Sequence, residues 1–404
     1  MKQSHYDVSV VGAGPAGLIA AEKIASEGNS VVVFEEHQRI GEPDHCAGLL
    51  STSGLQALEL SPPKGMIQNH VLGARLFSPS GDHITIERGK REALVIHRPR
   101  FDSWLGELAK GAGATIETSV KVVDVGKDES GNRMLSLRRA TESTRISSSI
   151  IVNAEGHRGI LSTKLGIPTV PRKSKFPAYQ FEVEDADVED DFVEMYFGRQ
   201  VAPGFFAWLI PLGNGKARIG LAAKDQPRKR LEGIMRFHKG LKDKLQNATI
   251  SRGFGGVVLL GMPVSPTYAE RALAVGDAAG IVKPTTGGGV IFGGVASRVA
   301  GRIVNEALKK NDYSTEMLQK YDSGWRSLLI NDLRSMNFTH RILSSLADKG
   351  LNSLFRDIRD LDLISTIRKE GNMDMQGRVI GRLLTQPIAL LAGLKAIRYF
   401  CSIP

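Results

Sequence analysis

A glycine-rich turn near the start of the chain constrains the fold more than any other feature. Residues 6–11 are largely apolar and β-branched, which is typical of a buried parallel strand, and they lead directly into the turn Gly12–Gly17. Beyond the turn, apolar residues recur at helical spacing as far as Ala25, and Gly28 is expected to end that helix. A second apolar strand, residues 30–34, follows. Strand, turn, helix and strand in this order predict a dinucleotide-binding βαβ unit.

Each residue of this unit has an expected task. Gly12 makes the tight turn, Gly14 lets the backbone approach a pyrophosphate, and Gly17 lets the helix pack closely against the strand. The pyrophosphate would lie on the free N–H groups of the helix start, beside Ala16. Glu35, which ends the second strand, is placed to accept hydrogen bonds from a ribose. Its charge would repel a 2′-phosphate, which argues against NADP at this unit.

Composition limits the class of protein and its partners. The chain has 404 residues, 42% hydrophobic and 24% charged, which fits a globular protein of two or three domains. Cys46 and Cys401 make no disulfide framework, so we expect a reducing, cytoplasmic setting, with neither a signal peptide nor a membrane-spanning run. The net charge of +10 suggests an anionic partner. The basic residues are dispersed and not interleaved with aromatics, which disfavours nucleic acid, and no metal site is predicted.

The chain between its motifs shows a regular order of elements. Residues 36–51 form a loop rich in Gly, Pro and His, and a loop of this length is usually functional or disordered. The patterning then predicts the following elements: a β-hairpin over 71–87, a helix over 101–110, short strands over 115–148, strands of a second, mostly antiparallel sheet over 175–221, an amphipathic helix over 229–245, and helices after 313 broken at Gly350, Gly371 and Pro387.

Two further turns resemble the first in their chemistry. A hydrophobic strand ends in Ala154-Glu155-Gly156, and another ends at Asp277. The Asp277 carboxylate can bond a ribityl hydroxyl, and its place at a helix start is expected to keep it ionised. The N–H groups around Gly288 and Gly289 open a long helix that runs towards Leu308. Pointed at the N1–C2=O edge of a flavin, that helix start would stabilise the negative charge of the reduced ring.

This order of motifs resembles the glutathione-reductase-type FAD fold, in the branch of p-hydroxybenzoate hydroxylase, and within it the geranylgeranyl reductase family over residues 5–335. The resemblance implies an α/β protein: a Rossmann-like FAD-binding domain with an inserted antiparallel β-sheet substrate domain and a helical C-terminal region. The implied boundaries are 1–165 and 256–335 for the two parts of the FAD-binding domain, with a β-hairpin insertion near 68–97, then 166–255 for the substrate domain and 336–404 for the helical region.

The resemblance also implies cofactor-binding residues. Arg98, in the run 95–102, would contact the FAD. Glu155 and Gly156 match the family's Ala-Asp-Gly motif, with Glu in place of Asp. Cys46-Ala47-Gly48 matches a Cys-Gly-rich loop near the flavin, with Ala47 where a Gly is usual. Lys283 stands where the family has an acid. Its ammonium could lie near the N1 edge and raise the flavin's potential, or face solvent, since lysines are rarely buried.

An aromatic stretch is the expected substrate wall. Residues 203–211 are similar to the family's Tyr-x-Trp-x-Phe-Pro motif, with Phe206 in place of Tyr and Ile210 in place of Phe. An apolar, aromatic wall would suit a greasy substrate beside the flavin, and ordinary core packing is the alternative explanation. We assign Phe206 and Trp208 to the catalytic site, together with Cys46.

The resemblance implies an FAD-dependent reductase that saturates isoprenoid C=C bonds of membrane lipids or their precursors, with hydride from reduced flavin and a proton from a nearby acid. The alternative is an FAD monooxygenase or halogenase, because residues 206–211 are similar to the Trp-x-Trp-x-Ile-Pro motif of flavin halogenases without its first Trp. A third class is a flavoprotein used only for electron transfer or lipid binding. The electron donor, NAD(P)H or ferredoxin, stays open, because no second G-x-G-x-x-G is present.

The expected partners are an isoprenoid lipid substrate and, peripherally, an anionic membrane at the inner face of the cell. Residues 387–404 have apolar positions at helical spacing interrupted by Lys395 and Arg398, too short and too charged to span a bilayer. Two readings of this tail stay open: a helix packed on the protein's own core, or an interfacial helix resting on anionic lipid.

Overall fold

The computed structural model describes residues 5–140, 142–360 and 363–377, and the chain divides into two units. The first unit comprises residues 1–44, 98–175 and 259–330, and the second comprises 45–97, 176–258 and the residues from 331 onward. The sequence placed the hairpin near 68–97 as an insertion in the FAD-binding domain. The structure groups that segment with the second unit, because one of its strands pairs with a strand of the second unit's sheet.

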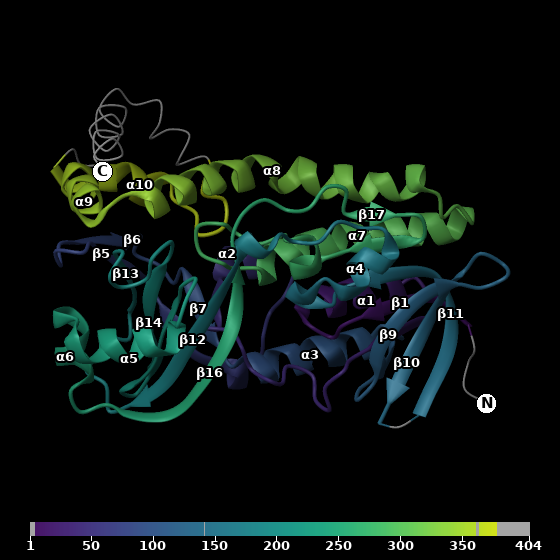
Figure 1. Ribbon diagram of the computed structural model, residues 1–404, viewed down its shortest axis with the longest axis horizontal. Coiled ribbons are helices and arrows are strands. Elements are labelled where there is room, and N and C mark those ends of the chain that lie inside the picture. The colour runs from purple at the N-terminus through teal and green to yellow at the C-terminus, as the bar shows by residue number, and fades with distance from the viewer. Residues whose placement is uncertain (1–4, 141, 361–362, 378–404) are drawn as a thin grey trace. The chain divides into compact units, whose positions relative to one another are not determined.

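The first unit is built on an eight-stranded sheet (Figure 1). Five neighbouring strands are parallel, in the order β8 (Thr115–Glu117), β2 (Val31–Phe34), β1 (His5–Val11), β11 (Glu142–Asn153) and β18 (Ala272–Ala274). The antiparallel strands are β17 (Tyr268–Ala269), β10 (Arg133–Arg139) and β9 (Lys121–Lys127). Val8 pairs with Val31 on one side and Ile150 on the other, and is fully buried. The predicted βαβ unit is therefore confirmed.

Helices pack together beside this sheet. Helix α1 (Pro15–Ala25) begins with Pro at its first position and ends before Gly28, as the sequence predicted. It packs against α7 (Val290–Lys310) and α3 (Arg98–Gly111). The short helix α4 (Ile160–Leu165) follows β11 and lies against β9. The expected helix over 101–110 is confirmed as α3 and begins three residues earlier, at Arg98.

The second unit contains two sheets. The larger has seven strands, in the order β16 (Thr249–Leu259), β12 (Lys175–Glu184), β15 (Lys216–Ala222), β14 (Phe206–Gly213), β13 (Phe192–Phe197), β5 (Gly73–Phe77) and β6 (His83–Glu87). The smaller has β3 (Leu49–Ser51), β7 (Ala93–Ile96) and β4 (Ile67–Val71). Strands β5 and β6 form the predicted hairpin, and β5 joins the large sheet in parallel with β13. The antiparallel second sheet expected from the sequence is confirmed.

The two faces of the large sheet pack on different partners. One face, with Ile219 and Leu221 at its centre, forms a core with Leu231 and Leu241 of helices α5 (Pro227–Phe237) and α6 (Lys239–Leu245). The expected single helix over 229–245 is thus two helices, because His238 adopts an extended conformation between them. On the opposite face, Ile210 packs with apolar residues of the small sheet, which are Val71, Ala93 and Val95.

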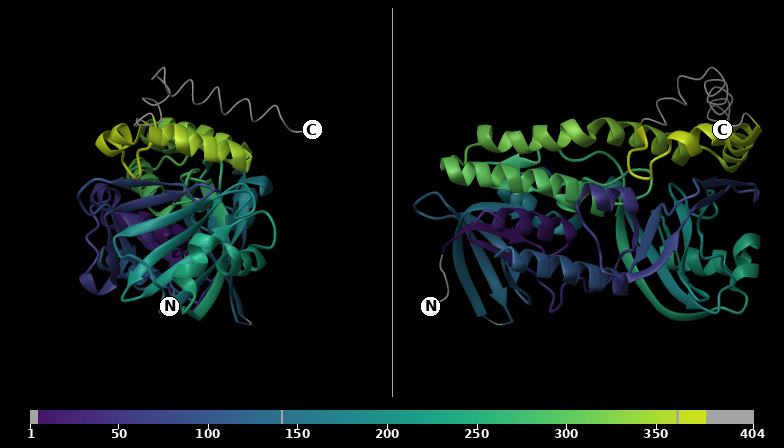
Figure 2. Two further views of the ribbon diagram at one scale, coloured as in Figure 1. Left: turned by 90° about the vertical axis from the view of Figure 1, so that its left-hand side faces the viewer. Right: turned by 180° about the vertical axis from the view of Figure 1, so that it is seen from behind.

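The chain ends in helices, as expected. Helix α8 (Thr315–Ser345) is followed by α9 (Asp348–Asp360) and α10 (Leu363–Glu370), and both shorter helices lie against β6 (Figure 2). Gly350 lies inside α9, so the predicted break occurs instead between α8 and α9. The predicted break at Pro387 and the tail over 387–404 lie outside the described residues. Among the helices that the structure describes, none combines the length and apolarity that a membrane span requires.

Candidate active site

The glycine turn after β1 has the geometry of an anion site. Gly12 has φ of +103°, and a side chain at Gly12 or Gly17 would collide with a backbone carbonyl of Ala154 or of Gly12. A Cβ at Gly14, by contrast, would have nothing within 4 Å. No side chain caps the start of α1, and its first turn carries no acidic residue. The N–H groups of that turn therefore remain for a ligand, and they suit the negative charge of a pyrophosphate.

Glu35 stands beside this turn and is held by it. Its Oε2 accepts a hydrogen bond of 2.9 Å from the Ala13 N–H. Its Oε1 accepts one of 2.9 Å from the His37 N–H, and His37 Nδ1 lies 2.6 Å from the same oxygen. The carboxylate therefore fixes the turn and the loop after β2 at once. The sequence assigned Glu35 to a ribose, and its place at the turn keeps it within the predicted nucleotide site.

Glu155 has a structural task that the sequence did not indicate. Its carboxylate accepts hydrogen bonds from the N–H groups of Leu161 and Ser162 at the start of α4, and from the Asn153 side-chain amide. The extra methylene of Glu relative to Asp gives the reach to cap this helix. Any cofactor contact at this turn would then fall to backbone groups, and Gly156, with φ of +73° and open space at its Cβ position, can present them.

Asp277 lies where the start of α7 approaches β18. It belongs to the 3₁₀ turn η4 (Gly276–Ala279), and a Cβ at Gly289 would lie 3.0 Å from its Oδ1. Burial raises the pKa of Asp277, and the Arg98 guanidinium opposes that rise. The sequence considered only the helix start, which favours the ionised form; the structure adds desolvation, which is the largest cause of the shift in pKa and acts in the opposite direction.

Arg98 is a buried cation among carboxylates. Its Nε and Nη2 donate to the two oxygens of Asp102 at 3.0 and 2.8 Å, one turn along α3. Burial raises the pKa of Asp102, Arg98 lowers it, and the carboxylates of Asp44 and Glu35 raise it further. Arg98 thus acts electrostatically on both Asp102 and Asp277, and the sequence-predicted residues Glu35, Arg98 and Asp277 are brought into one part of the first unit.

The starts of α1 and α7 are packed together by small residues. A Cβ at Gly293 would lie 3.1 Å from Gly276 Cα, and one at Gly276 would lie 2.7 Å from the Cβ of Ala16. The predicted residues Ala16, Asp277 and Gly289 therefore meet at one place. Two helix starts and their N–H groups converge there, an arrangement suited to a dinucleotide with a charged centre and a polar ring edge.

Lys283 is buried, with 4% of its surface exposed. The backbone N–H of Lys283 donates to the Gly288 carbonyl at 3.1 Å, and the backbone N–H of Gly287 donates to the Lys283 carbonyl at 2.8 Å. A Cβ at Gly288 would meet Lys283 Cε at 2.8 Å and Nζ at 3.4 Å. The solvent-facing placement considered from the sequence is therefore wrong, and the side chain lies along the glycine triplet.

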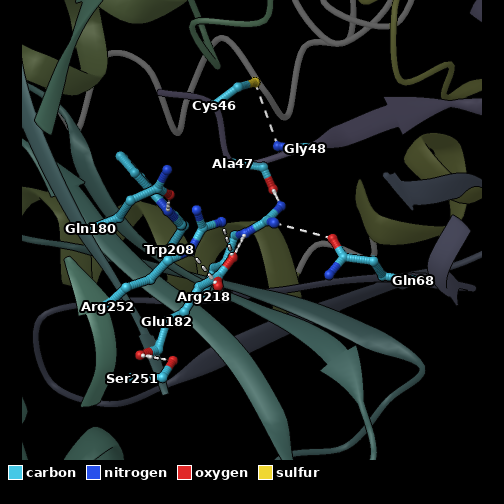
Figure 3. Close-up of polar contacts among 10 residues, drawn as sticks. All are labelled: Cys46, Ala47, Gly48, Gln68, Gln180, Glu182, Trp208, Arg218, Ser251 and Arg252. Atoms are coloured by element: carbon cyan, nitrogen blue, oxygen red, sulfur yellow. Dashed lines mark hydrogen bonds and ion pairs between the residues drawn. The ribbon is translucent and has the colours of Figure 1, made fainter. Parts of the chain in front are cut away.

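The Cys46 loop lies in the second unit and is held by hydrogen bonds, of which those at Ala47 and Gly48 are drawn in Figure 3. His45 Nδ1 donates to the Gly255 carbonyl at 2.8 Å. The Gly48 N–H donates to Cys46 Sγ at 3.4 Å, and Arg218 Nη1 donates to the Ala47 carbonyl at 3.0 Å. Cys46 itself is partly exposed. The backbone of the loop is thus held on both sides of the cysteine.

Phe206 and Trp208, both on β14, have different surroundings. Phe206 is buried and stacks on Phe205 with ring centroids 4.1 Å apart, so it contributes to packing. Trp208 is partly exposed, and its Nε1 donates to Gln180 Oε1 at 3.3 Å (Figure 3). A Cβ at Gly220 would lie 2.5 Å from the Trp208 ring, so a side chain at this position of β15 would displace the indole. Trp208 is the member of the predicted pair with accessible surface.

Sequence reasoning missed the charged residues beneath the Cys46 loop. Arg218 has no exposed side-chain surface, and its Nε donates to Glu182 Oε1 at 2.8 Å. Arg252 donates to the same carboxylate. Burial of Glu182 acts to raise its pKa, but the two guanidinium groups outweigh that effect and lower the pKa to about 2. A signal was present in the sequence: Arg218 interrupts the apolar strand 217–222, and Glu182 interrupts Phe181 and Val183.

Comparison with known proteins agrees with this geometry. The family model described as "FAD binding domain" matches residues 5–293. A digeranylgeranylglycerophospholipid reductase of Methanocaldococcus jannaschii is 32% identical over 355 residues, which cover 86% of this chain and 89% of that protein. The structure of a geranylgeranyl bacteriochlorophyll reductase-like protein from Thermoplasma acidophilum has a TM-score of 0.86 at 25% identity, covering 97% of this chain and 99% of that one. The flavin-dependent brominase Bmp2 shares the fold alone, with a TM-score of 0.72 at 17% identity, over 98% and 99% of the two chains. The chain therefore belongs to the family of FAD-binding flavoproteins that includes the digeranylgeranylglycerophospholipid reductases.

Proposed function

We propose that this protein is an FAD-dependent reductase that saturates C=C bonds in the isoprenoid chains of membrane lipids or their precursors. The observation that carries the proposal is the relative named digeranylgeranylglycerophospholipid reductase, which aligns over most of both chains. The structure supports the cofactor independently, through the open position at Gly14 and the two converging helix starts. The halogenase alternative rests on a likeness of fold alone.

The residues of the first unit would hold the cofactor. The N–H groups at Gly14 and the start of α1 would bind the pyrophosphate, and Glu35 would receive the ribose. Asp277 would bond a ribityl hydroxyl, and the N–H groups of Gly288 and Gly289 would face the polar edge of the ring. FAD, when bound and reduced, supplies a hydride to one alkene carbon.

The second unit would supply groups for the substrate. Trp208, which keeps accessible surface, suits a hydrocarbon chain, because such a chain is recognised by burial of apolar surface. We assign Cys46 to the reaction as a candidate source of the proton that the second alkene carbon requires. Cys46 is a partly exposed residue, and its Sγ accepts a hydrogen bond from the Gly48 N–H.

The test is co-expression with a pathway that makes a geranylgeranylated lipid precursor. We expect the mass of the lipid to rise by about two for each double bond, since saturation adds two hydrogens. Gly14→Val is the control, because its side chain would occupy the pyrophosphate's place. An unchanged lipid mass with flavin-loaded protein would contradict the proposal, and oxygen consumption coupled to substrate would favour the monooxygenase or halogenase class.

Two partners complete the proposal. Reduction of the flavin requires an electron donor, NAD(P)H or ferredoxin, and stopped-flow reduction by each distinguishes them.

The net charge of +10 supports peripheral contact with anionic lipid at the inner face of the membrane. Flotation with anionic liposomes should weaken as salt rises, and equal flotation with neutral liposomes would contradict an electrostatic contact.

A further inference from the structure

Arg218 is a fully buried charge at the point where the two sheets of the second unit meet. It lies on β15, opposite Glu182 of β12 and Ile210 of β14. Its three guanidinium nitrogens are all used: Nε donates to Glu182 at 2.8 Å, Nη1 to the Ala47 carbonyl at 3.0 Å, and Nη2 to Gln68 Oε1 at 3.1 Å (Figure 3). Gln68 belongs to the small sheet, so one side chain joins both sheets and the Cys46 loop.

A buried ion pair is a costly way to stabilise a sheet. Desolvation of the two charges offsets much of their attraction, and apolar side chains of similar volume often stabilise a core as well or better. Ala217 and Ile219, the neighbours of Arg218 on β15, are apolar and buried. What an apolar residue could not provide is the planar fork that binds three acceptors in fixed directions. We infer that Arg218 is used because its guanidinium fixes the positions of its three acceptors relative to one another.

The acceptor outside the sheets is the backbone of the Cys46 loop. Gly48 has φ of +79°, and a Cβ there would lie 2.5 Å from Arg218 Nη1, so glycine is required for this approach. The same Gly48 donates its N–H to Cys46 Sγ at 3.4 Å. The orientation of the Ala47–Gly48 backbone thus fixes both the carbonyl that Arg218 binds and the N–H that meets the sulfur.

We propose that Arg218, held in place by Glu182, is a positioning residue that orients the Cys46 thiol through the Ala47 carbonyl. This inference rests on the proposed function in so far as Cys46 takes part in alkene reduction. Arg218 itself touches neither sulfur nor substrate in this role. Its effect would be carried by the backbone of one peptide unit.

The experiment compares Arg218→Lys with Lys216→Gln, a control on the same strand whose ion pair with Glu184 is exposed. Lysine keeps the charge but lacks the fork, so it cannot serve all three acceptors. The readouts are the pH profile of Cys46 alkylation by iodoacetamide, followed by mass spectrometry of its peptide, and kcat and KM for alkene reduction. We expect Arg218→Lys to shift the Cys46 alkylation profile along the pH axis and to lower kcat several-fold with little change in KM. We expect Lys216→Gln to leave the alkylation profile, kcat and KM as in wild type.

The two readouts separate this inference from the proposed function. An alkylation profile of Arg218→Lys that matches wild type would overturn the positioning role, whatever the enzyme reduces. A displaced profile in a protein that reduces no alkene would support the positioning role and contradict the proposed function. Glu182→Gln is the second variant, because it keeps the Arg218 residue and removes the carboxylate that holds its guanidinium in position. If Arg218→Lys does not fold, a wild-type alkylation profile in Glu182→Gln refutes the inference.

Discussion

Loss of the Glu182 charge should destabilise the protein far more than loss of a neighbouring charge on the same strand. The pKa of Glu182 lies at about 2, against 4.5 for an ordinary Glu, because Arg218 and Arg252 bind its ionised form. At about 1.4 kcal/mol for each pKa unit, the ionised carboxylate stabilises the fold by at most about 3.5 kcal/mol. Arg252 is partly exposed and screened by solvent, so we expect Glu182→Gln to cost about 2–3 kcal/mol.

Glu184→Gln is the matched control. Glu184 lies two residues along β12 and pairs with Lys216 of β15 at 2.7 Å, but both side chains are about half exposed. Exposed pairs of this kind contribute about 0–1 kcal/mol. The two substitutions therefore remove the same charge from the same strand and differ in the burial of the partner, since Arg218 has no exposed side-chain surface.

Urea unfolding followed by circular dichroism at pH 7, with FAD in constant excess, measures both costs. The difference between wild type and Glu182→Gln should also depend on pH. Because the pKa of Glu182 is lower in the folded protein than in the unfolded chain, the stabilisation is complete above about pH 4.5 and is lost as the pH falls towards 2. A cost for Glu182→Gln within about 0.5 kcal/mol of that for Glu184→Gln would refute the assignment of a strong buried pair.

The cofactor and the reaction give further predictions. Gly14→Val should lose FAD and keep the Tm of FAD-free wild type, because its Cβ meets no protein atom. Gly17→Ala should lower the Tm of the FAD-free protein, because its Cβ meets a carbonyl of the turn. Equal flavin content in Gly14→Val and wild type would contradict the pyrophosphate site. Asp277→Ala should weaken FAD binding by about 1.5–3 kcal/mol, measured by equilibrium titration, and an unchanged Kd would remove the ribityl contact. Cys46→Ser should keep FAD and slow flavin reoxidation by substrate in rapid-mixing experiments; an unchanged rate would exclude the thiol from the reaction. Lys283→Asp should lower the flavin midpoint potential in potentiometry, and an unshifted midpoint would place the ammonium away from the ring.

The sequence predicted those parts of the fold that depend on local chemistry. A buried parallel strand, a glycine turn and an amphipathic helix each have a pattern within about twenty residues, and β1, α1 and β2 appear where that pattern put them. The same holds for the hairpin of β5 and β6 around Gly81, whose φ of +92° the turn requires.

What the sequence could not predict depends on partners distant in the chain. The grouping of residues 45–97 with the second unit follows from β5 pairing with β13, a contact that no local pattern reveals. Burial of Lys283 follows from the return of its side chain over Gly288. The buried Arg218 required knowledge that Glu182, Gln68 and Ala47 converge on it from three separate segments.

The alternation of the chain between its two units has a consequence for synthesis on the ribosome. The sheet of the first unit pairs Ile151 with Ala272, and the second unit, which begins at residue 45, still takes up residues from 331 onward. Neither unit can therefore be completed before the other has largely been made, although domains usually fold one after another as they emerge. A nascent chain stopped near residue 258 would lack β17, β18 and α7, and its exposed sheet edge would be a ready target for chaperones.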